Sequence, residues 1–246
     1  TGSLVNLTGA NAKTFSGLVT INSGGVLNLS TATAPAVNFG AGIVNNSDAT
    51  DSFKVGGAAT LIGALSGSGT GGFNFGSTLT ISSGTTTNSY TAGSVDVIVT
   101  GTLTLTGNWT QGANTILYYG SGNAIGGAGT LDASTNLNTI NYNASGTQTV
   151  KVLTYRNLTL SGTSVKTAAT TPTVNGVLSM EGTATIAVTT GVVTYGSSAT
   201  LQYNTTTSRT ASSEEWITSF NGSGGVIVGS TGVITLDSAK VFETSV

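Results

Sequence analysis

The stretch "VNGVLSMEGTATIAV" (Val174–Val188) decides which kind of β-structure this chain forms. Apolar residues recur at every second position along it, as they do in a strand that buries one face. Its Asn175-Gly176 pair is typical of the two-residue loop of a β-hairpin. Here the pair continues straight into "VLSM" (Val177–Met180). The stretch therefore favours strands that follow one another around a common core over strands that fold back on themselves.

The same alternation with period two recurs along the whole chain. It is found in "LVTINSGGVLNLS" (Leu18–Ser30), "STLTISSG" (Ser77–Gly84), "VTGTLTLTGNW" (Val99–Trp109) and "RNLTLSG" (Arg156–Gly162). Thr fills many of the positions between the apolar residues, where its β-branched side chain suits an extended backbone. Glycine-rich turn signals separate these segments, and no stretch has a convincing helical periodicity. The sequence therefore predicts an all-β protein.

A short phrase, consisting of a hydroxyl or Asn residue, then Gly, then alternating apolar residues, repeats at irregular intervals. It begins at Ser16, Thr100, Asn175 and Thr231. Repeated phrases of this kind are typical of solenoids, in which each coil stacks on the one before. We expect one elongated parallel β-helix (β-solenoid) domain over residues 1–246, with a weak subdivision near residue 130. Coils of roughly 20–25 residues would give on the order of ten coils, with Asn side chains stacked at the corners. A β-sandwich, or two sandwiches in tandem, is the alternative.

The composition excludes several classes of protein. Only 7% of the residues are charged, the net charge is −2, and the seven Lys and Arg residues are scattered. No cluster of them could neutralise several phosphates, so nucleic-acid binding is not expected. No apolar run approaches the length of a membrane span. The chain has no Cys, so it can form neither disulfides nor thiolate metal sites.

The absence of His removes serine-protease-like catalysis and imidazole-bound metals. We therefore expect no catalytic residues, no cofactor and no enzymatic activity. Among the nine Asp and Glu residues, Asp48 and Asp51 in "NNSDATD" (Asn45–Asp51) are the best candidates for calcium ligands. The segment lacks a recognisable calcium-loop signature, and a turn in which Asn and Asp bond their own backbone is favoured.

Two further motifs favour structural roles. Glu214 and Glu215 would face opposite sides of a strand, so "EEW" is interpreted as a short turn that packs Trp216 over a coil. The segment Gly67–Gly72 matches the pattern of a dinucleotide-binding loop, but a strand rather than a helix follows it. It is therefore interpreted as a glycine-rich turn.

Aromatic residues could line a sugar-binding surface, although packing inside or at the edge of the coils is favoured. The candidates are Trp109, Tyr118, Tyr119, Tyr142, Tyr155, Tyr195 and Tyr203.

Several passages in the second half resemble secreted bacterial repeat proteins, namely large adhesin-like or autotransporter-passenger-like chains. These passages are "NWTQGANTILYYG" (Asn108–Gly120), "TLDASTNLNTINYNASGTQTVK" (Thr130–Lys151), "VLTYRNLTLSGTSVKT" (Val152–Thr167), "VNGVLSM" (Val174–Met180) and "SATLQYNTTTSRTASSEEW" (Ser198–Trp216). The resemblance implies a single-stranded right-handed parallel β-helix and an extracellular or cell-surface location. It also implies that glycans or a host or cell surface are candidate partners.

The end of the chain resembles its beginning. "SAKVFETSV" (Ser238–Val246) is similar to "NAKTFSGLV" (Asn11–Val19), and "VITL" (Val233–Leu236) to "LVNL" (Leu4–Leu7). If both ends are unblocked strands, one copy can continue the coils of another, and such a non-closing contact produces a filament.

We therefore expect a head-to-tail homopolymer, an extracellular structural filament or surface fibre. Its assembly interface is predicted to contain Leu4, Val5, Leu7, Val241, Phe242 and Val246. A segment of a large cell-surface adhesin is the first alternative. A polysaccharide lyase or hydrolase is the second, and it would need carboxylates that converge in one groove.

Overall fold

The protein, seen in a computed structural model, is described over residues 4–6, 11–30, 35–82, 85–90 and 95–242. It divides into two compact units. Unit 1 comprises residues 1–121 and 125–138, and unit 2 comprises residues 122–124 and 139–246. The subdivision expected near residue 130 falls within the last segment of unit 1.

All regular structure in the described ranges is β-strand, and none of these residues is helical. The strands of unit 1 are β1 (Leu4–Asn6), β2 (Lys13–Phe15), β3 (Val19–Ile21), β4 (Val26–Leu29), β5 (Val37–Phe39), β6 (Ile43–Asn45), β7 (Phe53–Val55), β8 (Ala59–Leu61), β9 (Leu65–Gly67), β10 (Phe73–Phe75), β11 (Leu79–Ile81), β12 (Thr85–Tyr90), β13 (Val95–Val99), β14 (Leu103–Leu105), β15 (Asn108–Thr110), β16 (Thr115–Tyr119) and β17 (Leu131–Asp132). Those of unit 2 are β18 (Thr139–Tyr142), β19 (Gln148–Val150), β20 (Thr154–Tyr155), β21 (Asn157–Leu160), β22 (Val165–Thr170), β23 (Thr173–Val174), β24 (Val177–Glu181), β25 (Thr185–Thr190), β26 (Thr194–Tyr195), β27 (Thr200–Asn204), β28 (Arg209–Ala211), β29 (Ser219–Phe220), β30 (Gly225–Val228), β31 (Ile234–Leu236) and β32 (Val241–Phe242).

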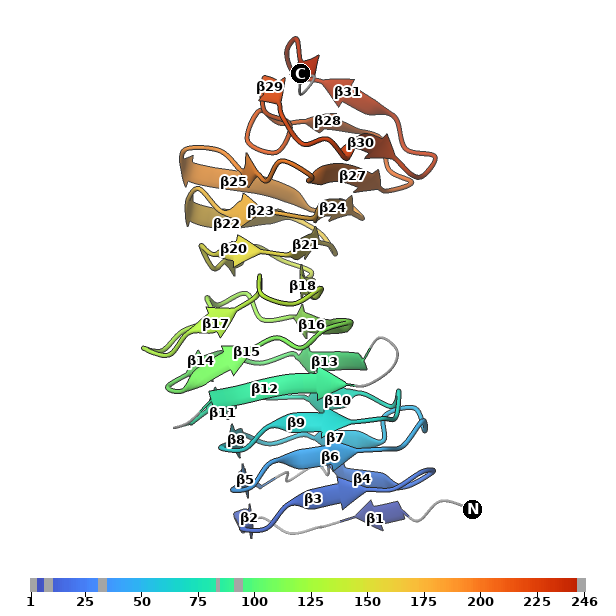
Figure 1. The fold of residues 1–246 in the computed structure, drawn as a ribbon, viewed down its shortest axis with the longest axis vertical. Coiled ribbons are helices and arrows are strands. Elements are labelled where there is room, and N and C mark those ends of the chain that lie inside the picture. The colour runs from blue at the N-terminus through green and yellow to red at the C-terminus, as the bar shows by residue number, and fades with distance from the viewer. Residues whose placement is uncertain (1–3, 7–10, 31–34, 83–84, 91–94, 243–246) are drawn as a thin grey trace. The chain divides into compact units, whose positions relative to one another are not determined.

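The strands stack as successive turns of a parallel β-solenoid (Figure 1). In unit 1 the sheets run β1-β4-β7-β10-β13-β16, β2-β5-β8-β11-β14 and β3-β6-β9-β12-β15-β17. In unit 2 they run β18-β21-β24-β27-β30, β19-β22-β25 and β20-β23-β26, with the further pairs β28-β31 and β29-β32. With few exceptions each strand pairs with the third strand after it, so three strands make one coil, and the chain makes about 10 turns. The predicted β-solenoid is confirmed. The β-sandwich alternative is wrong, because the described strands pair in parallel rather than as hairpins.

The stretch Val174–Val188 forms β-strands, as its alternation of apolar residues predicts. Val174 ends β23 and Val177 begins β24, so Asn175-Gly176 forms a corner between two strands of one coil. The backbone N–H of Asn175 donates to Tyr155 O of the preceding coil at 2.9 Å. No hairpin forms here, because the corner finds its hydrogen-bond partners in the coil beneath it.

The core is built by in-register stacking of every second residue. Leu158, Leu178 and Leu201 occupy paired positions on β21, β24 and β27, and all three are fully buried. Along each strand, polar residues alternate with the core residues and face outward. One such row crosses the sheet from β2 to β14 and consists of Thr14, Asn38, Thr60, Thr80 and Thr104. Burial of one apolar side chain contributes about 1.5–3 kcal/mol relative to leaving it exposed. The alternation in the sequence is thus the alternation between core and solvent.

Corners are held by side chains that reach from one coil to the next. Asn46 Oδ1 accepts a hydrogen bond from Ser68 N at 3.0 Å, and Asn157 Oδ1 accepts one from Val177 N at 2.9 Å. The sequence predicted stacks of Asn on Asn at the corners. In these two cases the Asn instead satisfies a backbone N–H group of the next coil, which would otherwise lie unpaired.

In the glycine-rich segment Gly67–Gly72, Gly67 ends β9 and residues 68–72 form the connection to β10, which lies directly on the corner of the preceding coil. A Cβ atom added at Gly67 would lie 1.9 Å from Asn45 O, and one at Gly69 would lie 2.4 Å from Ser47 N. Only glycine allows the two backbones to approach this closely. The segment leads into strand β10 and not into a helix, so it lacks the helix N-terminus that a dinucleotide-binding loop requires.

Replacement of Gly67 therefore tests the corner packing. Gly67→Ala is expected to lower the free energy of unfolding by more than about 1 kcal/mol, because the backbone of Asn45 must move. Gly17→Ala is the matched control, since a Cβ atom there meets nothing within 4 Å, and it should change the free energy by less than about 0.5 kcal/mol. Urea denaturation of both variants measures the difference. Equal effects would contradict the proposed close packing of coils.

Candidate functional site

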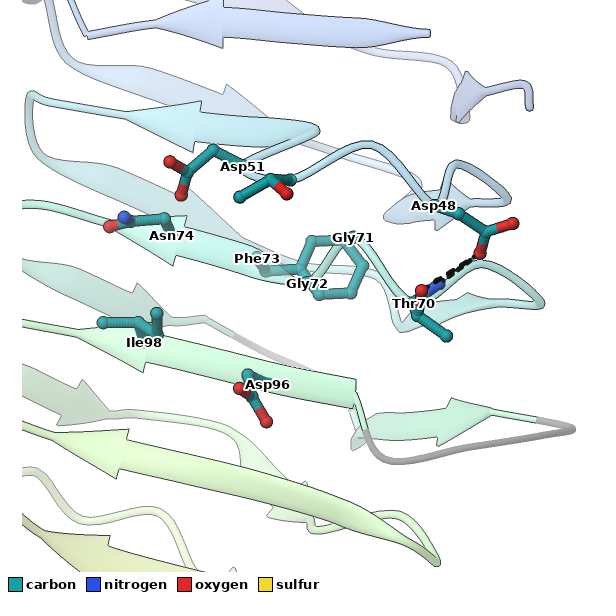
Figure 2. Close-up of a pocket in the computed structure, with 10 residues that line it drawn as sticks. Asp48, Asp51, Thr70, Gly71, Gly72, Phe73, Asn74, Asp96 and Ile98 are labelled. Atoms are coloured by element: carbon teal, nitrogen blue, oxygen red, sulfur yellow. Dashed lines mark hydrogen bonds between the residues drawn. The ribbon is translucent and has the colours of Figure 1, made fainter. Parts of the chain in front are cut away.

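The two calcium candidates, Asp48 and Asp51, line one surface pocket of about 300 Å³, but their carboxylates do not converge on one point. Figure 2 shows Asp48 and Asp51 at opposite ends of this pocket. Asp48 Oδ1 accepts hydrogen bonds from Thr70 N at 2.8 Å and from Thr70 Oγ1 at 3.1 Å. Asp51 Oδ2 accepts one from Lys54 Nζ at 2.6 Å. Across the described part of the chain, no group of three Asp or Glu side chains could hold a metal ion.

The third carboxylate of this pocket, Asp96, lies on β13 and is half-buried. Burial raises its pKa above the usual value for an aspartate. Asp48 and Asp51 accept hydrogen bonds from Thr70 and Lys54, so these two carboxylates take part in different interactions. They therefore do not form the convergent acidic pair that a glycoside hydrolase uses.

Six of the seven aromatic residues considered for sugar binding face the core. Trp109, Tyr119, Tyr142, Tyr155 and Tyr203 are fully buried, Tyr195 is 3% exposed, and Tyr118 is half-buried. Tyr142 and Tyr155 also bond each other through their hydroxyl oxygens at 3.1 Å. The interpretation as packing residues is confirmed for the six buried ones, and these six form no exposed platform for a sugar ring.

The "EEW" segment forms a single turn near the end of unit 2. Trp216 N donates to Ser212 O at 2.9 Å, which closes the turn. Glu215 is fully buried, and both its carboxylate oxygens accept hydrogen bonds from Arg209 at 2.8 Å. Tyr203 Oη adds a third bond to Glu215 at 3.1 Å. Burial raises the pKa of Glu215 above its usual value, although Arg209 beside it acts in the opposite direction.

Trp216 was predicted to pack over a coil, and its ring packs between Tyr203 and Phe242. The Trp216 ring lies 6.0 Å from that of Tyr203 and 6.1 Å from that of Phe242. Phe242 also lies 6.5 Å from Phe220. The inner side of Phe242 is therefore packed against buried aromatic rings, and its position in the last coil is fixed.

The last coil that the structure describes, formed by β30, β31 and β32, exposes apolar side chains. We define the C-terminal end face as the core-facing residues of β30, β31 and β32, namely Val226, Val228, Ile234, Leu236 and Phe242. Their register partners in the coil beneath are Leu201, Tyr203, Arg209, Ala211 and Phe220. Four of those five partners are at most 1% exposed, whereas Val228 is 51%, Leu236 44% and Phe242 55% exposed. Among the described residues, these positions are therefore in register with core positions but are themselves exposed or half-buried.

Three strand edges surround this face. β30, β31 and β32 are each the last strand of their sheet, and β1, β2 and β3 are the first strands of the three sheets of unit 1. At the first coil, Phe15, Val19 and Ile21 occupy alternate positions of β2 and β3, and the Phe15 ring stacks on Phe39 at 5.4 Å. An unpaired edge carries free backbone donors and acceptors and can pair with another strand.

The structure places the predicted interface residues differently from one another. Phe242 lies on the C-terminal end face. In β1, Val5 pairs in register with Leu27, a core residue, and Leu4 pairs with Val26. Val241 does not belong to the end face: it pairs with Ser219, which is exposed on the outer surface. Leu7 and Val246 lie outside the described residues.

Sequence reasoning missed four of the five end-face residues. Val226, Val228, Ile234 and Leu236 alternate within "VIVGSTGVITL" (Val226–Leu236), the same signal that identified the other strands. The similarity between the two chain ends drew attention to residues 238–246 instead. The alternation in the last full coil was therefore the better signal.

Comparisons of the chain with protein-family models, with curated proteins and with solved structures gave no match. The described residues contain no helix long and apolar enough to cross a membrane.

The buried ion pair of Arg209 and Glu215 allows a test of what stabilises the turn beneath the end face. Arg209→Met is expected to lower the free energy of unfolding by about 3–5 kcal/mol, because it leaves the carboxylate of Glu215 buried without its counter-charge. The double variant Arg209→Met/Glu215→Leu should recover at least half of that loss, since no buried charge remains. Urea denaturation monitored by Trp fluorescence measures both. A double variant no more stable than the single one would mean that the ion pair itself, rather than packing, holds the turn.

Proposed function

We propose that this protein is an extracellular structural subunit that assembles head to tail into a filament or surface fibre. The single observation that supports the proposal is the C-terminal end face, where apolar core positions are half exposed. A large exposed apolar surface on a soluble protein usually marks an interaction site. Here the surface also has the geometry of a solenoid core, so the partner that fits it is another coil.

The contact between two copies would join different surfaces, the last coil of one and the first coil of the next. Such a heterologous contact leaves one free end of each kind, so it repeats without closing and yields a filament. Backbone hydrogen bonds would extend each sheet across the junction, and the end face would become buried. The junction would be stabilised by the same backbone hydrogen bonds and apolar contacts that join any two neighbouring coils within the chain.

A segment of a large cell-surface adhesin is the second candidate function. The resemblance of the second half to adhesin-like repeat proteins favours it, and in that case the end face would be covered by a further coil of the same chain. The mass of the native polypeptide separates the two proposals, since an adhesin would be far larger than 24.3 kDa. A polysaccharide lyase or hydrolase is not favoured, because Asp48 and Asp51 of the pocket are held by different partners, Thr70 and Lys54.

Two adjacent residues offer a matched test of assembly. Phe242 and Val241 are both 55% exposed, but Phe242 lies on the end face and Val241 on the outer surface. Phe242→Asp is expected to abolish filaments, because a carboxylate would be buried without a partner at each junction. Val241→Asp should leave assembly nearly unchanged. Negative-stain microscopy and light scattering of the 246-residue chain measure the length of the assemblies.

Circular dichroism of both variants verifies that the monomer remains folded. Filaments of equal length in the two variants would contradict the proposed role of the end face. Wild-type protein that stays monomeric at high concentration would contradict the filament itself.

A further inference from the structure

The chain contains two Asn-Gly pairs, Asn175-Gly176 and Asn221-Gly222. Both lie in corners, the first between β23 and β24 and the second between β29 and β30. In an Asn-Gly pair the backbone nitrogen of Gly can reach the side-chain carbonyl carbon of Asn, because no side chain on the Gly obstructs the approach. Either pair can therefore undergo deamidation, and the surroundings of each pair determine how readily it does so.

Deamidation needs no reactant other than water. After hydroxide removes its proton, the Gly nitrogen attacks Cγ of Asn. A bond from this nitrogen to Cγ forms, the bond from Cγ to Nδ2 breaks, and Nδ2 takes a proton from water and leaves as ammonia. Water then opens the cyclic imide that results. Opening at Cγ gives Asp, whereas opening at the backbone carbonyl carbon gives isoaspartate, in which the chain runs through the former side chain.

The fold restrains both reacting groups of the first pair. The backbone N–H of Gly176 donates to Arg156 O at 2.7 Å, and that of Asn175 donates to Tyr155 O at 2.9 Å. The next coil covers the carboxamide, because a Cβ atom added at Gly196 would lie 2.8 Å from Asn175 Oδ1. The nitrogen and the carboxamide of this pair can therefore approach each other only if the corner opens.

The second pair lacks these restraints. Asn221 is exposed, whereas Asn175 is half-buried. Within the part of the chain that the structure describes, no residue accepts a hydrogen bond from the backbone N–H of Gly222, and none bonds the carboxamide of Asn221. The attacking nitrogen and the carboxamide of this pair are therefore not held apart by other hydrogen bonds.

The packing of coils nevertheless requires glycine at position 222. A Cβ atom added there would lie 2.3 Å from Ala199 O in the preceding coil, a distance that no other residue tolerates. The corner continues on the same support: Ser223 N donates to Ser197 O at 2.8 Å, and Gly224 N donates to Ala199 O at 3.1 Å. The close stacking of two corners thus maintains a reactive dipeptide at an exposed position.

We propose that Asn221 is a site of deamidation, at which Gly222 N attacks Asn221 Cγ and water completes the conversion to aspartate or isoaspartate. This inference goes beyond the proposed filament and does not depend on it. Each event replaces a neutral amide by a carboxylate. The isoaspartate product also lengthens the backbone immediately before Ser223 and Gly224, whose hydrogen bonds hold the corner on the preceding coil.

Peptide mapping by mass spectrometry tests the assignment. The folded 246-residue chain is incubated at neutral and at mildly alkaline pH, and the fraction of each Asn converted to Asp or isoaspartate is followed with time. Asn221 is expected to convert several-fold faster than Asn175. Its rate should rise with pH, because the attacking nitrogen must lose its proton. The same incubation in urea should bring the two rates together, since the corner around Asn175 then no longer exists.

The variant Asn221→Gln is the matched control. Its longer side chain disfavours ring closure, so conversion at position 221 should be lost, while circular dichroism verifies that the solenoid is folded. Conversion of Asn175 at least as fast as that of Asn221 in the folded chain would overturn the assignment. So would an intact Asn221 in folded protein whose urea-unfolded form deamidates. An equal preference for Asn221 in the folded and unfolded chains would mean that the local sequence, and not the fold, selects the site.

Discussion

Parallel backbone pairing between successive coils is the constraint on which the rest of this structure depends. A strand of three residues cannot satisfy its own donors and acceptors, so each coil needs a coil on either side. The same neighbours cover its apolar side chains. Buried columns such as Leu158, Leu178 and Leu201 arise because the coils stack in register. In the last coil that the structure describes, the corresponding positions Val228, Leu236 and Phe242 are exposed.

The corners determine the register that this stacking needs. Gly67 and Gly69 let one corner lie on the backbone of the corner before it, and Asn46 and Asn157 bond N–H groups of the next coil. These contacts fix the corner length as well as its position.

The alternation of apolar and polar residues was sufficient to predict an all-β protein, because core and solvent alternate along every strand. The repeated phrase with Gly favoured a solenoid over a β-sandwich. It also identified the Gly67–Gly72 segment as a turn and the aromatic residues as packing residues. The pairing of strands could not be predicted, since corners vary in length and a register depends on contacts between coils. The assignment of Val241 to the assembly interface stays a prediction, and the structure adds that Val241 is in register with the exposed Ser219, on the outward side of β32. The ion pair of Arg209 with Glu215 had no signal in the sequence beyond the proximity of the two residues.

Backbone hydrogen exchange as a function of protein concentration tests the central claim most directly. If the first and last coils pair with each other between copies, amides of β1–β3 and β30–β32 gain protection as concentration rises, because these strands cease to be edges. Amides of interior strands such as β7 and β10 should keep the same protection throughout. Unchanged exchange at both ends, in samples that contain long assemblies, would contradict the account.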